Sequence, residues 1–290
     1  MRYDFIRRHK KAYPVTVMCK VLEVSRSGFY DYLCHRRSSQ DADPEQAALE
    51  ARVKEIFRNS KKTYGSRRIL EQLKKDGYEI GRYRVRGLMR KLGLKAKEPR
   101  HYKVTTDSNH KHPVAPNRLD RQFDVDAPNK VWTTDITYVW TLEGWLHLAI
   151  VMDLFSRQIV GWAMDKRMKA NLVMEALAMA YWRRKPDPGL LHHSDRGSQY
   201  ACDKYQDQVE HYQMIPSMSR KGDCWDNSPT ERFFRSLKSE HLADFRFVTT
   251  DMASKEILEY ITFYNAYRLH STLGYESPMD YKRQKLLKAA

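Results

Sequence analysis

Three acidic residues, Asp135, Asp195 and Glu231, occupy positions from which carboxylates could do chemistry. Asp135 lies in the middle of TTDITYV, a run of β-forming residues in which a charge is costly unless it is paired or binds a metal. Asp195 ends the run LLHHSD, where a strand commonly opens onto a site, and Glu231 lies in the first turn of a helix that starts at SPT. Carboxylates that converge from different elements can hold two divalent metal ions, as phosphodiester transfer requires.

Each acid also has an ordinary structural explanation. Asp135 could face water on an edge strand, and Glu231 could be favoured in a first helical turn by the helix dipole. The spacing favours a common site, because Asp195 follows Asp135 by 60 positions and 35 residues separate Asp195 from Glu231. That arrangement resembles the D,D(35)E signature of the transposase and retroviral integrase superfamily.

The sequence around the acids extends this resemblance over the whole chain. The segments are WTTDITYV, HSDRGSQY, GDCWDNSPTERFFRSLKSE and FYNAYRLHSTLGYESPMDY, with YGSRRI and RGLMRKLGL in the N-terminal region. They are similar to the downstream-frame product of the insertion-sequence family whose transposase arises by frameshifting between two overlapping frames. The resemblance implies a transposase that cleaves element ends in double-stranded DNA, transfers them into target DNA and acts as a homo-oligomer on DNA.

The resemblance also implies roles for single residues. Asp135, Asp195 and Glu231 would bind two Mg²⁺ or Mn²⁺ ions, one activating a water or a DNA 3′-hydroxyl and the other stabilising the leaving oxygen. Lys238 stands seven positions after Glu231, two helical turns along the same face, where the superfamily carries a Lys or Arg that contacts DNA. No covalent protein–DNA intermediate is expected.

The elements that must position these acids can be read from the second half of the chain. Runs at 131–141, 145–156 and 157–168 predict three strands in an antiparallel meander. Helix and strand patterns then alternate, at 170–184, 190–195, 203–213, 214–219 and 229–242. The order β-β-β-α-β-α-β-α predicts an α/β, ribonuclease H-like catalytic domain over residues 130–285, with a mixed sheet and flanking helices.

Positive charge gathers in the first part of the chain. Residues 1–120 hold 29 basic and 14 acidic side chains, and the remainder holds 23 and 22. The net charge of +16 and the isoelectric point near 9.6 favour a polyanionic partner. DNA binding is therefore expected in the N-terminal region and a different task in the near-neutral remainder.

Helical patterns divide this all-α basic region into two DNA-binding segments. Residues 1–40 predict a helix-turn-helix with Ser25 at its turn, and residues 45–95 predict a second one that ends at a glycine. The last helix carries a basic cluster suited to a major groove, or alternatively to a solvated helix face. Residues 96–129 have prolines and no periodicity, which predicts a basic linker. The basic cluster is Arg82, Arg84, Arg86, Arg90 and Lys91.

Several other classes are disfavoured by the sequence. The longest apolar run, Leu146 to Leu154, is too short to cross a bilayer, and the first residues lack the apolar segment of a secretory signal. The four cysteines have no CxxC pairing, which predicts reduced thiols, and no cysteine pair stands at zinc-finger distance from His110 and His112. The protein is expected in the bacterial cytoplasm, associated with the nucleoid and not with a membrane.

Other residues near the acids could have either structural or functional roles. Asp153 is expected to be a structural aspartate at a turn rather than an outer ligand of the metals. Asp226 and Asn227 could orient DNA or the helix of Glu231, but they are expected to cap its turn. His192 and His193 are expected to point to opposite faces of their strand.

Further residues could contact DNA directly. The loop Arg220-Lys221-Gly222 could touch phosphates, and Trp225, Tyr264 and Arg268 could stack on splayed bases, although aromatics at helical spacing are more often core.

Three rival functions stay open at this point. A non-catalytic DNA-binding regulator of transposition is favoured by Met1 and the lack of a sustained heptad pattern, since the resembled enzyme is usually a longer fusion with a coiled coil. The intact acid triad argues against it. A ribonuclease or resolvase on the same fold would lack the basic N-terminal region. A tyrosine recombinase would use a residue such as Tyr264 or Tyr267, but no catalytic cluster of arginines and histidines surrounds them.

Overall fold

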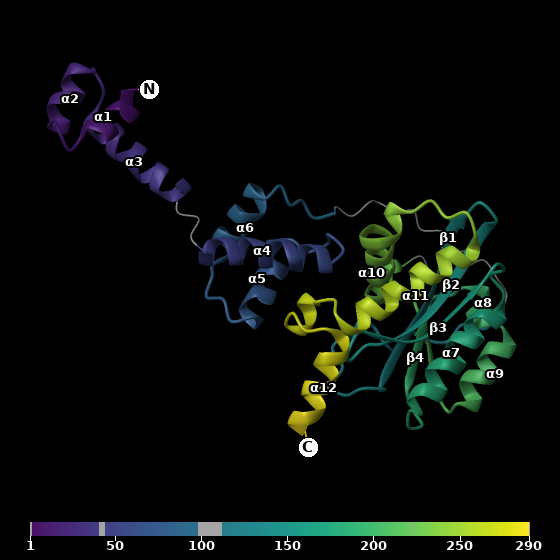
Figure 1. The fold of residues 1–290 in the computed structure, drawn as a ribbon. Coiled ribbons are helices and arrows are strands. Elements are labelled where there is room, and N and C mark those ends of the chain that lie inside the picture. Colours follow the sequence, from purple (N-terminus) through teal and green to yellow (C-terminus); the bar gives the residue numbers. More distant parts are fainter. Residues whose placement is uncertain (1, 41–43, 98–111, 222, 290) are drawn as a thin grey trace.

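A mixed sheet forms the centre of the C-terminal part of the molecule (Figure 1). The computed structural model describes residues 2–40, 44–97, 112–221 and 223–289. Over these residues the strands are Val131–Thr141 (β1), Gly144–Asp153 (β2), Gln158–Asp165 (β3), Leu191–Ser194 (β4) and Ile215–Met218 (β5).

The strand order in this sheet is β3-β2-β1-β4-β5. β1, β2 and β3 form the antiparallel meander expected from three β-rich runs joined by short turns. Gly144, with φ of +113°, begins β2 directly after the first of these turns. β4 and β5 add in parallel beyond β1. The predicted α/β ribonuclease H-like class is confirmed.

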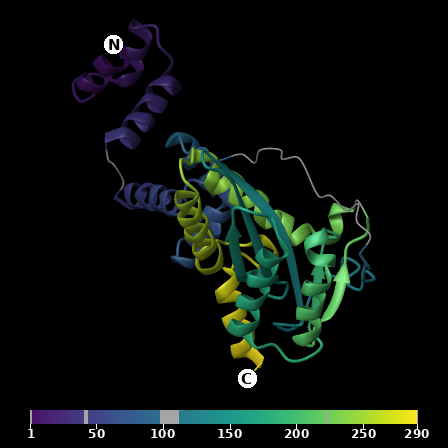
Figure 2. The same ribbon diagram turned by 90° about the vertical axis from the view of Figure 1, so that its right-hand side faces the viewer.

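Helices cover both faces of the sheet (Figures 1 and 2). Helix α7 packs closely on β3 because Gly161 has no side chain, and a Cβ there would lie 2.2 Å from the Ala176 carbonyl oxygen. One apolar core joins the sheet to α7, α8 and α9, and a second joins it to α10 and α11. These helices are Ala170–Arg184 (α7), Ser198–Ala201 (α8), Asp203–His211 (α9), Ser228–Ser236 (α10) and Thr250–Ala266 (α11), and Pro278–Ala289 (α12) ends the described chain.

In the described part of the chain, six helices precede the sheet and form two separate cores. Ser25 begins the third helix as its sequence predicts, since its Oγ accepts a hydrogen bond of 2.9 Å from the backbone N–H of Gly28. Gly93, with φ of +65°, follows the sixth helix and confirms the expected glycine end. The helices are Arg2–His9 (α1), Val15–Val21 (α2), Arg26–Gln40 (α3), Pro44–Asn59 (α4), Ser66–Lys75 (α5) and Arg82–Lys91 (α6).

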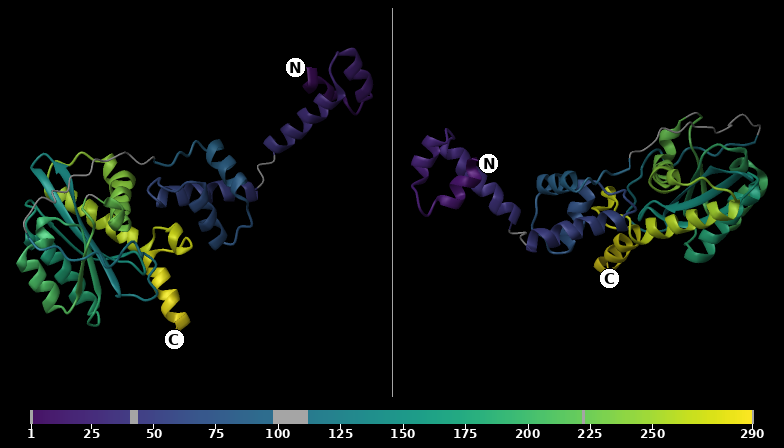
Figure 3. Two further views of the ribbon diagram at one scale, coloured as in Figure 1. Left: turned by 180° about the vertical axis from the view of Figure 1, so that it is seen from behind. Right: turned by 45° about the horizontal axis from the view of Figure 1, so that its top comes forward.

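The α4–α6 unit packs against the C-terminal end of the sheet-containing part, whereas α1–α3 stand apart (Figure 3). Leu269, which follows α11, enters the apolar core of α4–α6. The hydroxyl of Tyr64, in the turn before α5, accepts a hydrogen bond of 2.7 Å from the Leu269 N–H. Lys75 of α5 pairs with Glu276 at 2.8 Å. The helical unit is therefore fixed to the sheet-containing part by buried and polar contacts.

The segment before β1 carries no helix or strand over residues 112–130, and the rest of the expected linker lies partly outside the described residues. The N–H of Arg118 donates a hydrogen bond of 2.9 Å to Ser217 Oγ, so this stretch is held against β5. Among the described helices none is both long and apolar enough to cross a membrane.

Candidate active site

Asp135 lies where β1 leaves its parallel neighbour. β1 pairs with β2 along its length but with β4 only over Val131–Thr133, so Asp135 is two residues past the last β4 pair. Its Oδ1 accepts a hydrogen bond of 2.8 Å from the N–H of Ile136. Burial raises the pKa of Asp135 well above its usual value, and the nearby carboxylates of Asp195 and Glu231 raise it further.

Asp195 directly follows β4. Its Oδ1 accepts a hydrogen bond of 2.9 Å from the N–H of Gly197, which fixes the carboxylate in the turn before α8. A Cβ at Gly197 would come within 3.1 Å of that oxygen, so glycine keeps the turn tight. Asp195 influences Asp135, Glu231 and the buried Tyr200 hydroxyl by its charge, which shows that it belongs to one cluster with both acids.

Glu231 is brought to β1 by two contacts at the start of α10. The hydroxyls of Thr230 and Thr133 are 2.7 Å apart, and the side-chain amide of Asn227 donates a hydrogen bond of 3.0 Å to the Thr134 carbonyl. Both partners on β1 are the residues just before Asp135. Burial raises the pKa of the half-buried Glu231, Arg235 opposes this shift, and the charge of Asp195 adds to it.

Lys238 supplies the nearby positive charge. It lies in a π-helical turn, Leu237–His241, that continues α10, and its Nζ sits 4.8 Å from the centre of the Tyr138 ring. Burial lowers the pKa of this ammonium, and the charge of Asp135 opposes that shift. The structure thus brings Asp135, Asp195, Glu231 and Lys238 together, as their positions in the sequence predict.

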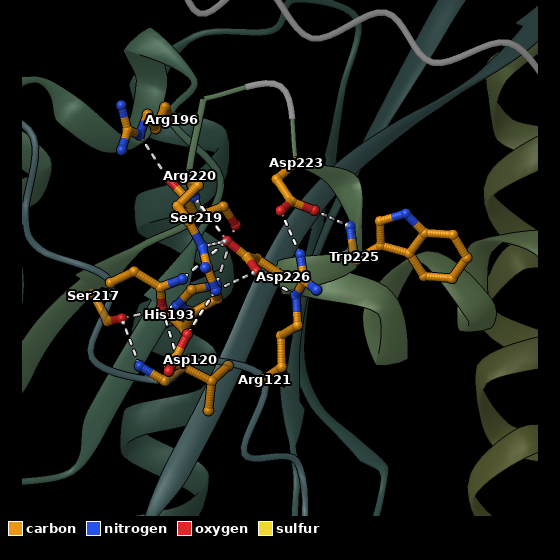
Figure 4. Close-up of polar contacts among 12 residues, drawn as sticks. Asp120, Arg121, His193, Arg196, Ser217, Ser219, Arg220, Asp223, Trp225 and Asp226 are labelled. Carbon is orange, nitrogen blue, oxygen red and sulfur yellow. Dashed lines mark hydrogen bonds and ion pairs between the residues drawn. The ribbon is translucent and has the colours of Figure 1, made fainter.

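A buried aspartate anchors the loop that leads into α10, and Figure 4 shows its contacts. Asp226 accepts hydrogen bonds of 2.9 Å from Arg121 Nε, the Arg220 N–H and Asn117 Nδ2, and one of 3.1 Å from Arg220 Nε. Burial opposes ionisation, but these donors outweigh it and lower the pKa of Asp226 to about 2. Asp226 therefore ties the loop before Glu231 to the segment before β1.

The expectation that Asp226 and Asn227 cap the helix is wrong. Neither side chain accepts a capping hydrogen bond from α10, because Asp226 is taken up by arginines and Asn227 by β1. Arg220 was expected to be available to phosphates, yet its guanidinium is paired with Asp226 and Asp120. Lys221 is exposed, and Gly222 lies outside the described residues.

The two histidines before Asp195 are structural. His192 Nε2 is 2.6 Å from the Tyr205 hydroxyl, and His193 hydrogen-bonds to Ser217 and Ser219 at 2.9 and 3.1 Å. Their opposite faces confirm the expected alternation along β4. Burial lowers the pKa of His192 to about 3 and that of His193 to about 4, so both stay neutral at physiological pH.

Asp153 is a structural aspartate, as expected. It is fully buried at the end of β2 and accepts hydrogen bonds from Ser156 Oγ at 2.7 Å and from the Asn129 N–H at 3.2 Å.

The residues expected to stack on bases separate into two groups. Trp225 is 68 % exposed on the loop before α10 and stays available to DNA. Tyr264 and Arg268 are buried, because α11 packs its aromatic face on the sheet, so base stacking by them is excluded in this arrangement. Cys19 and Cys202 are free thiols.

The basic residues of α6 lie on its exposed side. Val85, Leu88 and Met89 face the core of α4–α6. The opposite side carries the five basic residues that the sequence singles out, although Arg84 hydrogen-bonds to Gln46 and Lys91 pairs with Glu50 of α4. All five are exposed, namely Arg82, Arg84, Arg86, Arg90 and Lys91.

A buried ion pair in the turn that contains Lys238 could not be predicted from the sequence. Glu240 accepts hydrogen bonds from Arg268 at 2.6 and 2.7 Å, and Arg68 of α5 lies 3.6 Å away. Glu240, Arg268 and Arg68 are far apart in the chain. Only the motif YGSRR, which contains Arg68, could have indicated that this arginine has a structural role.

Another group of metal-binding side-chain types lies near this pair. The ligand atoms of His241, Glu256 and Glu259 lie within 4.8 Å of one another, and among the described residues the acids near Lys238 are more widely spaced than this. His241 is paired with Glu256 at 2.7 Å, and Lys61 pairs with Glu259. Lys61 offsets the charge of Glu259, and burial lowers the pKa of His241, so two carboxylates remain with one cation here. The three carboxylates near Lys238 are therefore the better candidates for cations.

Comparison with known families agrees with this arrangement. Residues 125–224 and 231–286 match models described as integrase core domain, and residues 44–102 match an HTH-like domain. The chain is 44% identical over 268 residues to the insertion element IS600 uncharacterized 31 kDa protein of Shigella sonnei, covering 92% of this chain and 98% of that protein. It is 38% identical over 288 residues to transposase InsF for insertion sequence IS3A of Escherichia coli, covering 99% and 100%.

Solved structures with similar folds are more distant. An intasome of simian T-cell lymphotropic virus, in complex with a PP2A regulatory subunit, aligns with a TM-score of 0.48 and 15% identity over 70% of this chain and 67% of that one. The HTLV-2 integrase catalytic core domain in complex with magnesium aligns with a TM-score of 0.43 and 16% identity, covering 54% of this chain and 97% of that one.

Proposed function

Because this chain belongs to the DDE-type insertion-sequence transposases, we propose that it cleaves the ends of its element and joins them to target DNA. The observation that carries this proposal is the cluster of Asp135, Asp195 and Glu231 at the point where β1 leaves β4. Each acid comes from a different element, and their charges act on one another. Such a convergence has a clear use in phosphodiester transfer.

The donor set fits divalent cations. Three carboxylates share the site with the ammonium of Lys238. Burial, and after it the charge of neighbouring acids, raises the pKa of Asp135 and Glu231, so bound cations would stabilise their ionised forms. Oxygen ligands of this kind suit Mg²⁺ or Mn²⁺. We propose that Asp135, Asp195 and Glu231 hold two such ions, which would supply activation of a water or a 3′-hydroxyl and stabilisation of the leaving oxygen.

The chain's own residues fix the geometry of this site. Thr230 and Asn227 join the start of α10 to β1, so Glu231 keeps its place beside Asp135. Gly197 holds the Asp195 carboxylate by its N–H. Lys238, half-buried next to Asp135, is placed to contact a phosphate of the strand that enters the site.

DNA binding is assigned to the helical units before the sheet. The exposed basic face of α6, with Arg82, Arg84, Arg86, Arg90 and Lys91, fits the backbone and groove of duplex DNA. A homo-oligomer on DNA is proposed because two element ends must be handled together. We propose that the protein acts in the nucleoid of the bacterial cytoplasm, where the element and its target DNA are located.

The alternative is a DNA-binding regulator without catalysis. It would use the basic helices in the same way, but it would have no need for three acids drawn together by buried contacts of α10 with β1. The two functions differ in one measurable property, which is metal-dependent chemistry on DNA.

The deciding experiment follows cleavage and joining of a labelled duplex that ends in the element's terminal repeat. Joined product is expected with Mg²⁺ or Mn²⁺ and not with EDTA. Asp135→Asn, Asp195→Asn and Glu231→Gln should each abolish joining while they retain DNA binding in a mobility-shift assay. Asp207→Asn, an exposed acid of α9, is the matched control and should keep full activity. Full activity in any of the three variants would overturn its assignment, and binding without chemistry in the wild type would favour the regulator.

A further inference from the structure

A pocket lined by aromatic side chains lies beside the candidate active site. It has a volume of about 340 Å³ and is formed by the end of β1, the start of β2 and the segment after α10. Its aromatic walls are formed by Tyr138, Trp140, Trp145 and Phe245, and Lys238 also lines it. We call this site the aromatic pocket.

These aromatic rings are held in place but remain open to solvent. Trp140 is 55 % exposed and Trp145 is 47 % exposed, although β-strand tryptophans are readily buried. The Trp145 ring packs edge-on against Trp140 at 4.8 Å and against Tyr138 at 4.9 Å between ring centres. A cluster of this size on the surface marks a binding site, because it leaves apolar area in water that a partner could cover.

The pocket and the acids have Lys238 as a common neighbour. Tyr138 lies three residues after Asp135 on β1, so their Cα atoms are about 10 Å apart along the strand. Lys238 bridges the two, since its ammonium interacts with the Asp135 charge and lies over the Tyr138 ring. Phosphates follow one another every ~3.4 Å along the axis of a DNA strand. A DNA strand with one phosphate at the acids would therefore reach the pocket within about three nucleotides.

We propose that the aromatic pocket binds an unpaired nucleobase of the DNA strand held at the acids. A flat base can stack on the exposed surface of Trp140 or Trp145, and such stacking tolerates any base because each base has a π-face. The neighbouring Lys238 offers a positive charge to the phosphate of the same nucleotide. A pocket that accepts the base would offset the cost of unpairing it at the element end. This inference rests on the proposed function, from which it takes the position of the DNA.

The charge at the rim favours a nucleotide over a second copy of the chain as occupant. A protein partner would gain from apolar contact but would bury the ammonium of Lys238 against an apolar face, at a cost in desolvation. A nucleotide uses both parts of the site, the rings for its base and the ammonium for its phosphate.

The test compares binding of two labelled duplexes to the full chain in EDTA, where no cleavage occurs. One duplex is fully paired, and the other has the same sequence with three unpaired nucleotides at the end of one strand. The wild type should bind the forked duplex about tenfold more tightly. Trp140→Ala and Trp145→Ala should lose this preference and leave binding of the paired duplex unchanged. Trp182→Ala, an exposed tryptophan on α7, is the matched control and should keep the preference.

Two further measurements make the result specific. Trp140→Phe and Trp145→Phe retain a ring and should restore most of the preference, which excludes loss through misfolding. An unpaired 5-iodouracil in the forked duplex should crosslink on irradiation to Trp140 or Trp145, as mapped by mass spectrometry.

Contrary results are equally clear. A wild type with no fork preference, or alanine variants that keep it, would overturn the proposal, and so would variants that change only the oligomeric state in light scattering. The binding assay needs no chemistry. Acid variants that lose strand joining but keep the fork preference therefore test the proposed function and the aromatic pocket separately.

Discussion

Replacing Asp226 by asparagine should loosen the loop that carries Trp225 and leads into α10. Its carboxylate is fully buried and its pKa falls from the usual 3.8 to about 2, because hydrogen bonds from Arg220 and Arg121 outweigh burial. At 1.36 kcal/mol for each pKa unit, this shift corresponds to a stabilisation of about 2 kcal/mol in the folded state. The Asp226→Asn variant should therefore unfold more easily by about 2 kcal/mol.

The pH dependence of this loss has a defined sign. The pKa is lowered on folding, so the stabilisation is complete above the unfolded value and is lost as the pH falls through about 2. The difference between wild type and variant should thus be constant above about pH 5 and shrink below about pH 4. Urea unfolding followed by tryptophan fluorescence measures it at each pH.

A matched acid in the same network provides the control. Asp120 also pairs with Arg220, at 2.6 Å, but its side chain is 65 % exposed. Water screens this pair, so Asp120→Asn should cost no more than about 0.5 kcal/mol. Strand joining should fall in Asp226→Asn and stay unchanged in Asp120→Asn. If the two variants lost equal stability, the argument from burial would be refuted.

Three other predictions follow from the same structure. Asp135→Asn should raise the melting temperature in EDTA at pH 7 by roughly 2–4 °C. Burial and neighbouring acids raise the pKa of this carboxyl, so its ionised form opposes folding. The gain in melting temperature should vanish below about pH 4, where the carboxyl is protonated in the unfolded chain as well. Arg86→Ala should weaken DNA binding and lower the salt slope by about 1 in a filter-binding titration, with a smaller effect for Lys91→Ala, which is paired with α4. Tyr64→Phe should cost about 1–3 kcal/mol in urea unfolding because the Leu269 N–H loses its partner.

The features of local origin could be predicted from the sequence. The meander of β1 to β3 follows from β-rich runs joined by short turns, and the helix after Ser25 follows from its capping side chain. Asp135 stands out because a charge within a β-forming run is costly, and Asp195 and Glu231 stand out because the 35 residues between them resemble the D,D(35)E signature. These signals depend on neighbours in sequence or on one regular spacing, so they survive without knowledge of the fold.

The features that depend on distant partners could not be predicted. Asp226 was expected to cap a helix because that is the local preference of aspartate, whereas the tertiary fold brings Arg121 to it from 105 positions away. Tyr264 was considered for DNA because its neighbours are polar, yet the α11 face that contains it covers the sheet. The aromatic pocket was missed for the same reason, since its walls come from β1, β2 and the segment after α10.

The buried charge of Glu240 links the α4–α6 unit to the segment that carries Lys238. Glu240 stands two residues after Lys238 in the same π-helical turn, and burial would raise its pKa, but Arg268 and then Arg68 more than offset this and lower it. Arg68 belongs to α5, so the helical unit contributes to balancing a charge of the segment that follows Glu231. Moving α5 away would leave part of that buried charge unbalanced, at a cost in free energy. The contacts therefore favour one arrangement of the helical unit relative to the acids.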